Sequence, residues 1–109
     1  MKSKIIIFAI VVIFFVSCKK DSTAPVPGAN EVFMTGSMFT PASITVNKGT
    51  TITWTNQESL THTVTSNTSV FNSGDMGNGK TFSFTFSTAG SFPYHCIYHS
   101  GMTGTVTVQ

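Results

Sequence analysis

Residues 81–108 read TFSFTFSTAGSFPYHCIYHSGMTGTVTV, and their alternating pattern is the strongest indication of the fold. Three phenylalanines in its first six residues alternate with Thr and Ser, so one face of the segment is apolar and the other carries hydroxyl groups. An apolar period of two residues is typical of a β-strand. Gly90 interrupts the pattern, a second apolar run follows it, and residues 103–108 alternate again. We therefore predict three consecutive strands here.

The rest of the chain after residue 30 has the same character. Ile44 and Val46 alternate with polar residues, and so do Ile52 and Trp54. Residues 31–109 contain 17 Thr and 10 Ser but only one Leu and two Ala, so strand formers outnumber good helix formers. This composition predicts an all-β fold, a Greek-key β-sandwich of about seven strands. The predicted strands are 31–36, 43–47, 51–56, 62–66, 81–86, 91–96 and 103–108, and the long segment 67–80 is expected to cross between the sheets.

The N-terminal residues have a different composition. A short basic start precedes an unbroken apolar run over 5–16, which is too short for a bilayer span of about 20 residues and is typical of a secretory signal. Cys18 directly follows a serine, which resembles the lipobox of bacterial lipoproteins and implies cleavage before Cys18 and its lipidation. Phe15 stands where that motif usually has Leu. Ordinary cleavage, with secretion of the domain, and an uncleaved anchor are therefore the alternatives.

These features divide the chain into three parts. We predict a signal peptide over 1–17, the lipidated cysteine and a flexible, proline-containing linker over 18–30, and one domain over 31–109. Residues 18–109 hold four lysines, four acidic residues and no arginine, so the mature chain is neutral and nucleic acid is a poor partner. The expected location is the periplasm or the cell surface, with the membrane contacted only through the lipid.

Four residues of the domain carry metal-binding chemistry. Cys96, His99 and Met102 lie close together in the sequence, and His62 begins another predicted strand. One thiolate, two imidazoles and a weak thioether are the ligand set of a blue-copper electron-transfer site. Structural zinc usually takes paired Cys or His ligands, and the domain has no second thiolate. We therefore predict one mononuclear type 1 copper ion, held by His62, Cys96, His99 and Met102.

Simpler explanations exist for these residues one at a time. A single cysteine on a strand is usually a small core residue. His95 is adjacent to Cys96, so on a strand its side chain faces the opposite side, and we interpret it as a surface or outer residue rather than a ligand.

Several segments resemble, in order, the strands of the cupredoxins of the plastocyanin, pseudoazurin and amicyanin group. The short Cys-x-x-His-x-x-Met loop is most similar to that of amicyanin. The matching segments are 39–46 (FTPASITV), 49–56 (GTTITWTN), 62–66 (HTVTS), 79–86 (GKTFSFTF) and 90–96 (GSFPYHC).

This resemblance implies roles for particular residues. Met102 would be the long axial ligand, and Thr63 would tie the two ligand segments together by hydrogen bonding. His99 would be the ligand nearest solvent. Many members of the family have proline where this chain has Thr61 and Tyr98; neither change removes a donor atom.

We therefore expect an electron carrier of the cell envelope rather than an enzyme, cycling between Cu(I) and Cu(II). Its partners would be redox proteins of the cytochrome, oxidase or dehydrogenase type, docking near His99 on a monomeric domain. An apolar rim of Met38, Leu60, Met76 and Ile97 is expected around that ligand. The alternatives are a copper storage or delivery protein with the same ligands, and a metal-free interaction module.

Overall fold

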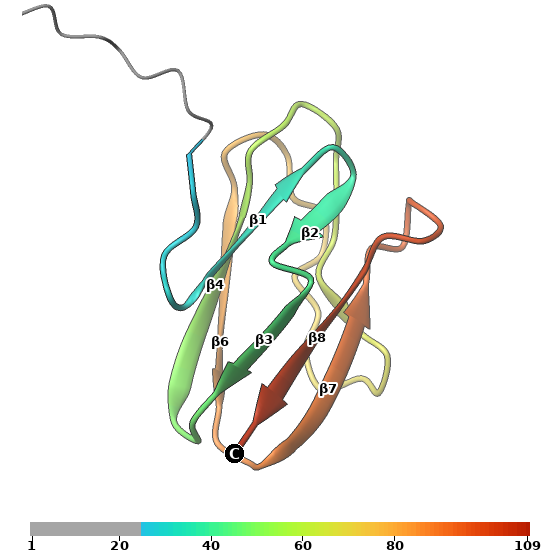
Figure 1. Cartoon of the computed structure of the whole chain (residues 1–109). Coiled ribbons are helices and arrows are strands. Elements are labelled where there is room, and N and C mark those ends of the chain that lie inside the picture. The colour runs from blue at the N-terminus through green and yellow to red at the C-terminus, as the bar shows by residue number, and fades with distance from the viewer. Residues whose placement is uncertain (1–24) are drawn as a thin grey trace, which may run out of the picture.

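The computed structural model describes residues 25–109, which form two β-sheets packed face to face (Figure 1). The strands are β1 (Glu31–Thr35), β2 (Met38–Thr40), β3 (Ser43–Val46), β4 (Thr50–Asn56), β5 (Thr65–Ser66), β6 (Thr81–Phe86), β7 (Gly90–His95) and β8 (Thr103–Val108). One sheet has the order β2-β1-β4-β6 and the other β3-β8-β7-β5. The predicted all-β sandwich is confirmed.

Within the described part, no helix is long and apolar enough to span a membrane. The predicted signal peptide over 1–17 and the predicted lipidation site at Cys18 lie outside the described residues. Of the predicted linker, the structure describes only residues 25–30.

Two elements differ from the prediction. The chain has an additional short strand, β2, because Gly36 and Ser37 both adopt positive φ angles of 59° and 54° and form a two-residue hairpin turn. The predicted strand 62–66 is shorter, since only β5 pairs with β7 there. His62 instead forms an isolated antiparallel bridge with Met76, so the segment 67–80 folds back along it before it crosses to the other sheet, as expected.

Alternation along the strands places the aromatic side chains in the core between the two sheets. Trp54 is fully buried, and its ring lies 5.5 Å from that of Tyr94 and 5.7 Å from those of Phe71 and Phe82 (centroid distances). Rings at these separations stabilise one another beyond the area that they bury. The core therefore forms a stiff base beneath the loops at one end of the sandwich.

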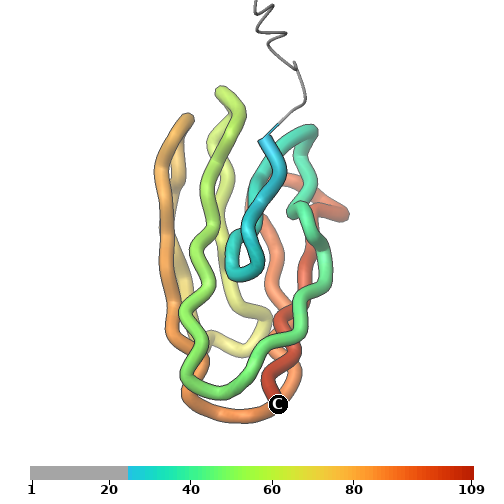
Figure 2. The backbone as a smooth tube through the Cα atoms, turned by 60° about the vertical axis from the view of Figure 1, so that its left-hand side comes forward, coloured from blue at the N-terminus to red at the C-terminus, as the bar shows by residue number. Residues whose placement is uncertain are grey.

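That end is marked by the β1–β2 turn and the loop that joins β7 to β8. Both lie away from the C-terminus in Figure 1, and the backbone trace in Figure 2 shows the two layers beneath them. Parallel pairing of β1 with β4 and of β3 with β8 joins distant parts of the chain within each sheet. The loops at this end are therefore anchored by strands from the whole domain.

Gly104 provides a test of the packing between β8 and β7. A Cβ atom at this position would lie 2.4 Å from Cζ and Oη of Tyr94, a fully buried ring. We expect Gly104→Ala to lower the free energy of unfolding by about 1–3 kcal/mol, because the ring has no room to move. Denaturant unfolding of the domain measures the change.

Gly77→Ala is the matched control. Its Cβ atom would meet nothing within 4 Å, and its φ angle is not positive. This substitution should leave the stability unchanged or raise it by up to about 1 kcal/mol. Equal effects of the two substitutions would contradict the packing described.

Candidate metal centre

The β7–β8 loop places three of the four predicted ligands close together in the chain. β7 and β8 pair up to His95 opposite Thr103, and Cys96 and Met102 continue the two strands. The backbone N–H of Cys96 donates to the Met102 carbonyl at 3.0 Å, and the Met102 N–H donates to the His99 carbonyl at 3.2 Å. Gly101 has a φ of 83°, which favours glycine and lets the short loop turn back. The loop is therefore closed at its base.

His62 reaches the same place from the segment between β4 and β5. Its backbone exchanges two hydrogen bonds with Met76, at 3.1 and 2.8 Å. The buried Asn56 donates through Nδ2 to the carbonyls of Leu60 and Met76, at 2.8 and 2.9 Å. One amide thus holds both sides of the segment that carries His62. Sequence reasoning missed Asn56, because an asparagine at the end of a strand is also typical of an ordinary turn.

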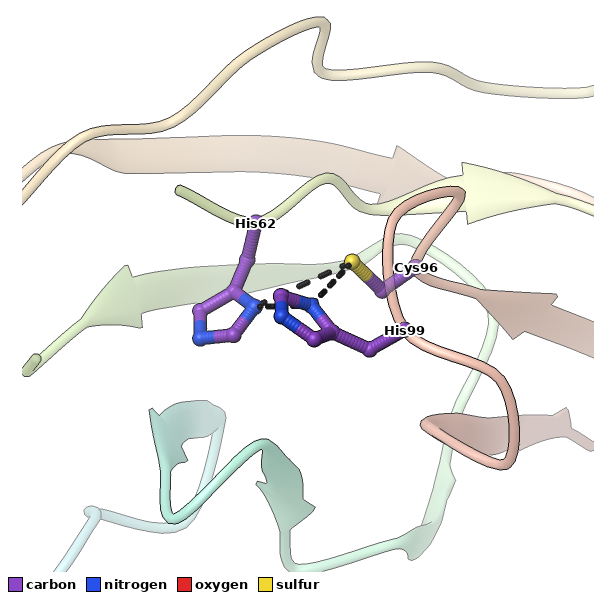
Figure 3. A group of neighbouring side chains, drawn as sticks. All are labelled: His62, Cys96 and His99. Carbon is purple, nitrogen blue, oxygen red and sulfur yellow. Dashed lines mark hydrogen bonds between the residues drawn. The ribbon is translucent and has the colours of Figure 1, made fainter. Parts of the chain in front are cut away.

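The donor atoms of His62, Cys96 and His99 converge, as Figure 3 shows. His62 Nδ1 lies 3.1 Å from His99 Nδ1, and Cys96 Sγ lies 3.8 and 3.5 Å from these two nitrogens. Ligand atoms that each lie about 2.0–2.3 Å from one ion are themselves about 3–4 Å apart. The three donors are therefore spaced as ligands of a common ion.

The chemistry of the cluster also suits a metal. Two ring nitrogens and a sulfur that face one another this closely are stabilised by a shared cation, and a thiolate with imidazoles favours d-block metals. His62 and Cys96 are buried, whereas His99 is partly exposed. Met102, the fourth predicted ligand, is buried and belongs to the same closed loop. The residues present fit a mononuclear copper ion.

Thr63 connects the two segments that carry the ligands. Its backbone N–H donates to Cys96 Sγ at 3.4 Å, and its Oγ1 accepts a hydrogen bond from the Ile97 N–H at 3.0 Å. Hydrogen bonds to a ligand atom, and to the backbone beside it, orient the ligands of a metal site. The structure thus contains the link between segments that the family resemblance implied for Thr63.

Two other residues were assigned from the sequence near this site. His95 Nδ1 lies 2.5 Å from Asn67 Oδ1, and His95 is not among the three residues whose donor atoms converge, as expected. Met76 was expected on the exposed rim, but it is buried at 2% exposure, so that expectation was wrong. The bridge to His62 turns Met76 into the core, and a sequence pattern without the bridge does not reveal this.

Glu58 is the acidic residue that contacts the cluster. Its Oε1 lies 2.5 Å from His62 Nε2, whereas the other donors face Nδ1 of the same ring. Partial burial raises the pKa of Glu58, but hydrogen bonds from the Ser37 N–H, from His62 and from the Gly36 N–H outweigh this effect, so the pKa lies below its usual value. The carboxylate is therefore charged at neutral pH. Sequence reasoning missed this contact, which depends on the shape of a loop.

Tyr98 extends from the exposed top of the loop. Its hydroxyl donates to Asp75 Oδ1 at 2.5 Å, and this bond, with the charge of Asp75, raises the pKa of Tyr98. The tyrosine thus ties the β7–β8 loop to the segment that precedes β6, at the position where many relatives have proline.

Comparisons with known proteins agree with this geometry. A family model described as a cupredoxin-like domain matches residues 5–108. A plastocyanin from Scenedesmus fuscus is 34% identical over 85 residues, which are 66% of this chain and 87% of that protein. An amicyanin from Paracoccus denitrificans is 34% identical over 74 residues, 59% of this chain and 53% of that protein.

Solved structures are similar over most of the domain. An oxidised amicyanin variant superposes with a TM-score of 0.70 at 31% identity, covering 75% of this chain and 83% of its own. Another amicyanin variant, solved in a Cu(I) form, gives a TM-score of 0.70 at 28% identity over 81% and 87% of the two chains. A purple cupredoxin from Nitrosopumilus maritimus gives 0.67 at 29% identity over 72% and 98%.

The hydrogen bond between Thr63 and the Ile97 N–H can be tested in the metal-free protein. Thr63→Val keeps the shape of the side chain and the N–H bond to Cys96, but leaves the Ile97 N–H without its acceptor. We expect the metal-free domain to lose about 1–2 kcal/mol of unfolding free energy. The control is Thr85→Val, which removes an exposed hydroxyl that pairs with Thr51 at 2.7 Å and should cost less than about 0.5 kcal/mol. Equal losses in the two variants would contradict a special role for Thr63.

Proposed function

The chain belongs to the cupredoxin-like family, and we propose that it is a type 1 (blue) copper electron carrier of the cell envelope. Plastocyanins and amicyanins are electron carriers rather than enzymes, and cupredoxins bind one type 1 copper ion, as the sequence predicted. The observation that carries the proposal is the convergence of His62 Nδ1, Cys96 Sγ and His99 Nδ1 within 4.8 Å of one another.

The residues that we propose would hold copper are His62, Cys96 and His99, with Met102 as a weak fourth donor. When bound, copper would accept and release one electron by cycling between Cu(II) and Cu(I). The protein contributes donors that barely need to move. His62 is held by the bridge to Met76, the loop is closed at its base, and the two are linked through Thr63. Such rigidity keeps the rearrangement between the two oxidation states small.

The exposed surface around His99 suits brief contacts with redox partners. Ile97 and Tyr98 are exposed on the same loop, and Leu60 and Met38 are exposed on segments at the same end. Met38 borders a shallow depression together with Gly101 and Met102. A small apolar face of this kind supports a weak and transient interface with a cytochrome, an oxidase or a dehydrogenase. Because residues 18–109 are neutral, such docking should depend little on salt.

The location is proposed from the leader. The predicted signal peptide over 1–17 and the cysteine at 18 support export and lipid anchoring at the periplasm or the cell surface. The plastocyanin and amicyanin relatives are soluble proteins of the chloroplast lumen or the periplasm, which supports a site of action outside the cytoplasm.

The first test is the colour of the protein. The domain, loaded with Cu(II), should show an intense visible band from charge transfer between the Cys96 thiolate and copper. Cys96→Ser should abolish this band, because it removes the thiolate, while the protein should remain folded. His95→Ala is the control and should leave the band largely intact, because His95 contacts Asn67 outside the cluster. A colourless wild-type protein would refute the proposal.

The second test concerns the docking face. Ile97→Glu should slow electron exchange with a reduced soluble cytochrome by about tenfold, since a charge in an apolar contact costs desolvation. Val70→Glu is the control: this exposed residue borders a depression with Ser87 and Thr88, which join β6 to β7 at the opposite end. Stopped-flow absorbance measures both rates. Slow exchange by the wild type, together with ready release of copper, would favour the storage or delivery function instead.

A further inference from the structure

The carboxylate of Glu58 joins two parts of the domain that are distant in sequence. Its Oε1 lies 2.5 Å from His62 Nε2 and accepts the Ser37 N–H at 2.9 Å, while its Oε2 accepts the Gly36 N–H at 2.6 Å. The backbone N–H of Glu58 donates to Asn56 Oδ1 at 3.0 Å. The side chain is 21% exposed. Glu58 is therefore fixed at both its backbone and its carboxylate.

The β1–β2 turn is shaped to receive this carboxylate. Gly36 and Ser37 both have positive φ angles, so their consecutive N–H groups point to the same side and form a small anion-binding nest. A left-handed conformation is unfavourable for a residue with a side chain, such as Ser37. Two hydrogen bonds to a charged acceptor offset that cost.

The contact with Glu58 selects one form of the His62 ring. A neutral imidazole has one N–H donor and one acceptor nitrogen. A carboxylate only accepts, so the proton of His62 resides on Nε2, and Nδ1 keeps its lone pair. Nδ1 is the nitrogen that faces Cys96 and His99. Glu58 thus prepares the ring for a metal before any metal is present.

The charge of Glu58 acts on the same ring. Among residues 25–109 no lysine lies within ion-pair distance of this carboxylate, and its contact with the neutral form of the His62 ring is a hydrogen bond. Its negative charge is therefore not neutralised by a neighbouring cation, and it reaches the metal position through a single imidazole. A negative charge one imidazole away from the metal position stabilises the doubly charged Cu(II) more than the singly charged Cu(I).

We propose that Glu58 is a positioning residue that fixes the Nδ1-binding form of His62 and shifts the copper redox equilibrium toward Cu(II), thereby lowering the reduction potential. This inference rests on the proposed function, because it concerns the same copper site. The nest formed by Gly36 and Ser37 holds the carboxylate in place. The β1–β2 turn is thus a part of the metal site although it supplies no ligand.

The main variant is Glu58→Gln, which keeps an oxygen for the nest and removes the charge. We expect it to bind Cu(II) 10- to 100-fold more weakly, the usual loss for an outer partner of a ligating histidine. The loss of affinity for Cu(I) should be smaller, so the reduction potential should rise. The rise should be about 59 mV for each factor of ten by which the loss of Cu(II) affinity exceeds the loss of Cu(I) affinity. The blue band should remain, because all four proposed ligands remain.

The matched control is Glu31→Gln. The Glu31 carboxylate also accepts a backbone N–H, that of Gly28 at 2.8 Å, so this variant loses the same charge and a similar bond. Glu31 lies at the other end of β1, about 16 Å along the strand from the nest formed by Gly36 and Ser37. Its potential and copper affinities should match the wild type. If Glu58→Gln behaves like this control in both measurements, the proposal is overturned.

A measurement on the metal-free wild-type protein separates the two proposals. Nitrogen-15 NMR of the histidine rings should show His62 protonated on Nε2, and the assigned signal should lose this preference in Glu58→Gln. A wild-type ring protonated on Nδ1 overturns the positioning role even if the protein turns blue with copper. If His62 is protonated on Nε2 but the protein stays colourless with copper, the copper function and the effect on the potential are overturned. The positioning of His62 by Glu58 then still stands.

Discussion

The structure depends on the hydrogen bond between the Cys96 N–H and the Met102 carbonyl at the base of the β7–β8 loop. This bond extends the pairing of β7 with β8 by one residue pair. The thiol of Cys96, the imidazole of His99 and the thioether of Met102 are therefore confined to one short loop. The remaining donor, His62, comes from a separate segment and needs its own support. That support is the bridge to Met76 and the amide of Asn56. The site therefore lies where the β7–β8 hairpin meets the segment that carries His62, and separate hydrogen bonds hold each of them.

The rigidity of this site comes from the aromatic core between the two sheets. Trp54 and Tyr94 cross almost at right angles, with an interplanar angle of 84°, and Phe71 packs against both. Tyr94 lies in β7, two residues before Cys96, which directly follows the strand, so the aromatic core restrains the backbone that leads to the thiol. Burial raises the pKa of Tyr94 to about 12, which reflects the apolar setting of its hydroxyl. Fold stability and ligand geometry thus have a common origin.

The sequence contained most of the fold and part of the site. Alternation locates strands such as β4, β6 and β8 because one face of each is buried, and the spacing of Cys96, His99 and Met102 reflects a local hairpin. The β1–β2 turn was missed because its form depends on a carboxylate more than 20 residues away. The partners of Asn56 and Glu58, and the burial of Met76, were missed for the same reason. These contacts join loops, and loops carry no periodic pattern.

The position of β6 at the edge of its sheet has a consequence for how the chain avoids self-association. This strand reads TFSFTF, without charge or proline, and edge strands of this kind readily pair with other chains when they become accessible. Lys80 stands just before it as a single charged gatekeeper. Its phenylalanines pack under Phe71 of the crossing segment, so opening that segment would expose an apolar face next to the unpaired edge. The aromatic core therefore protects the chain against aggregation as well as supporting the site.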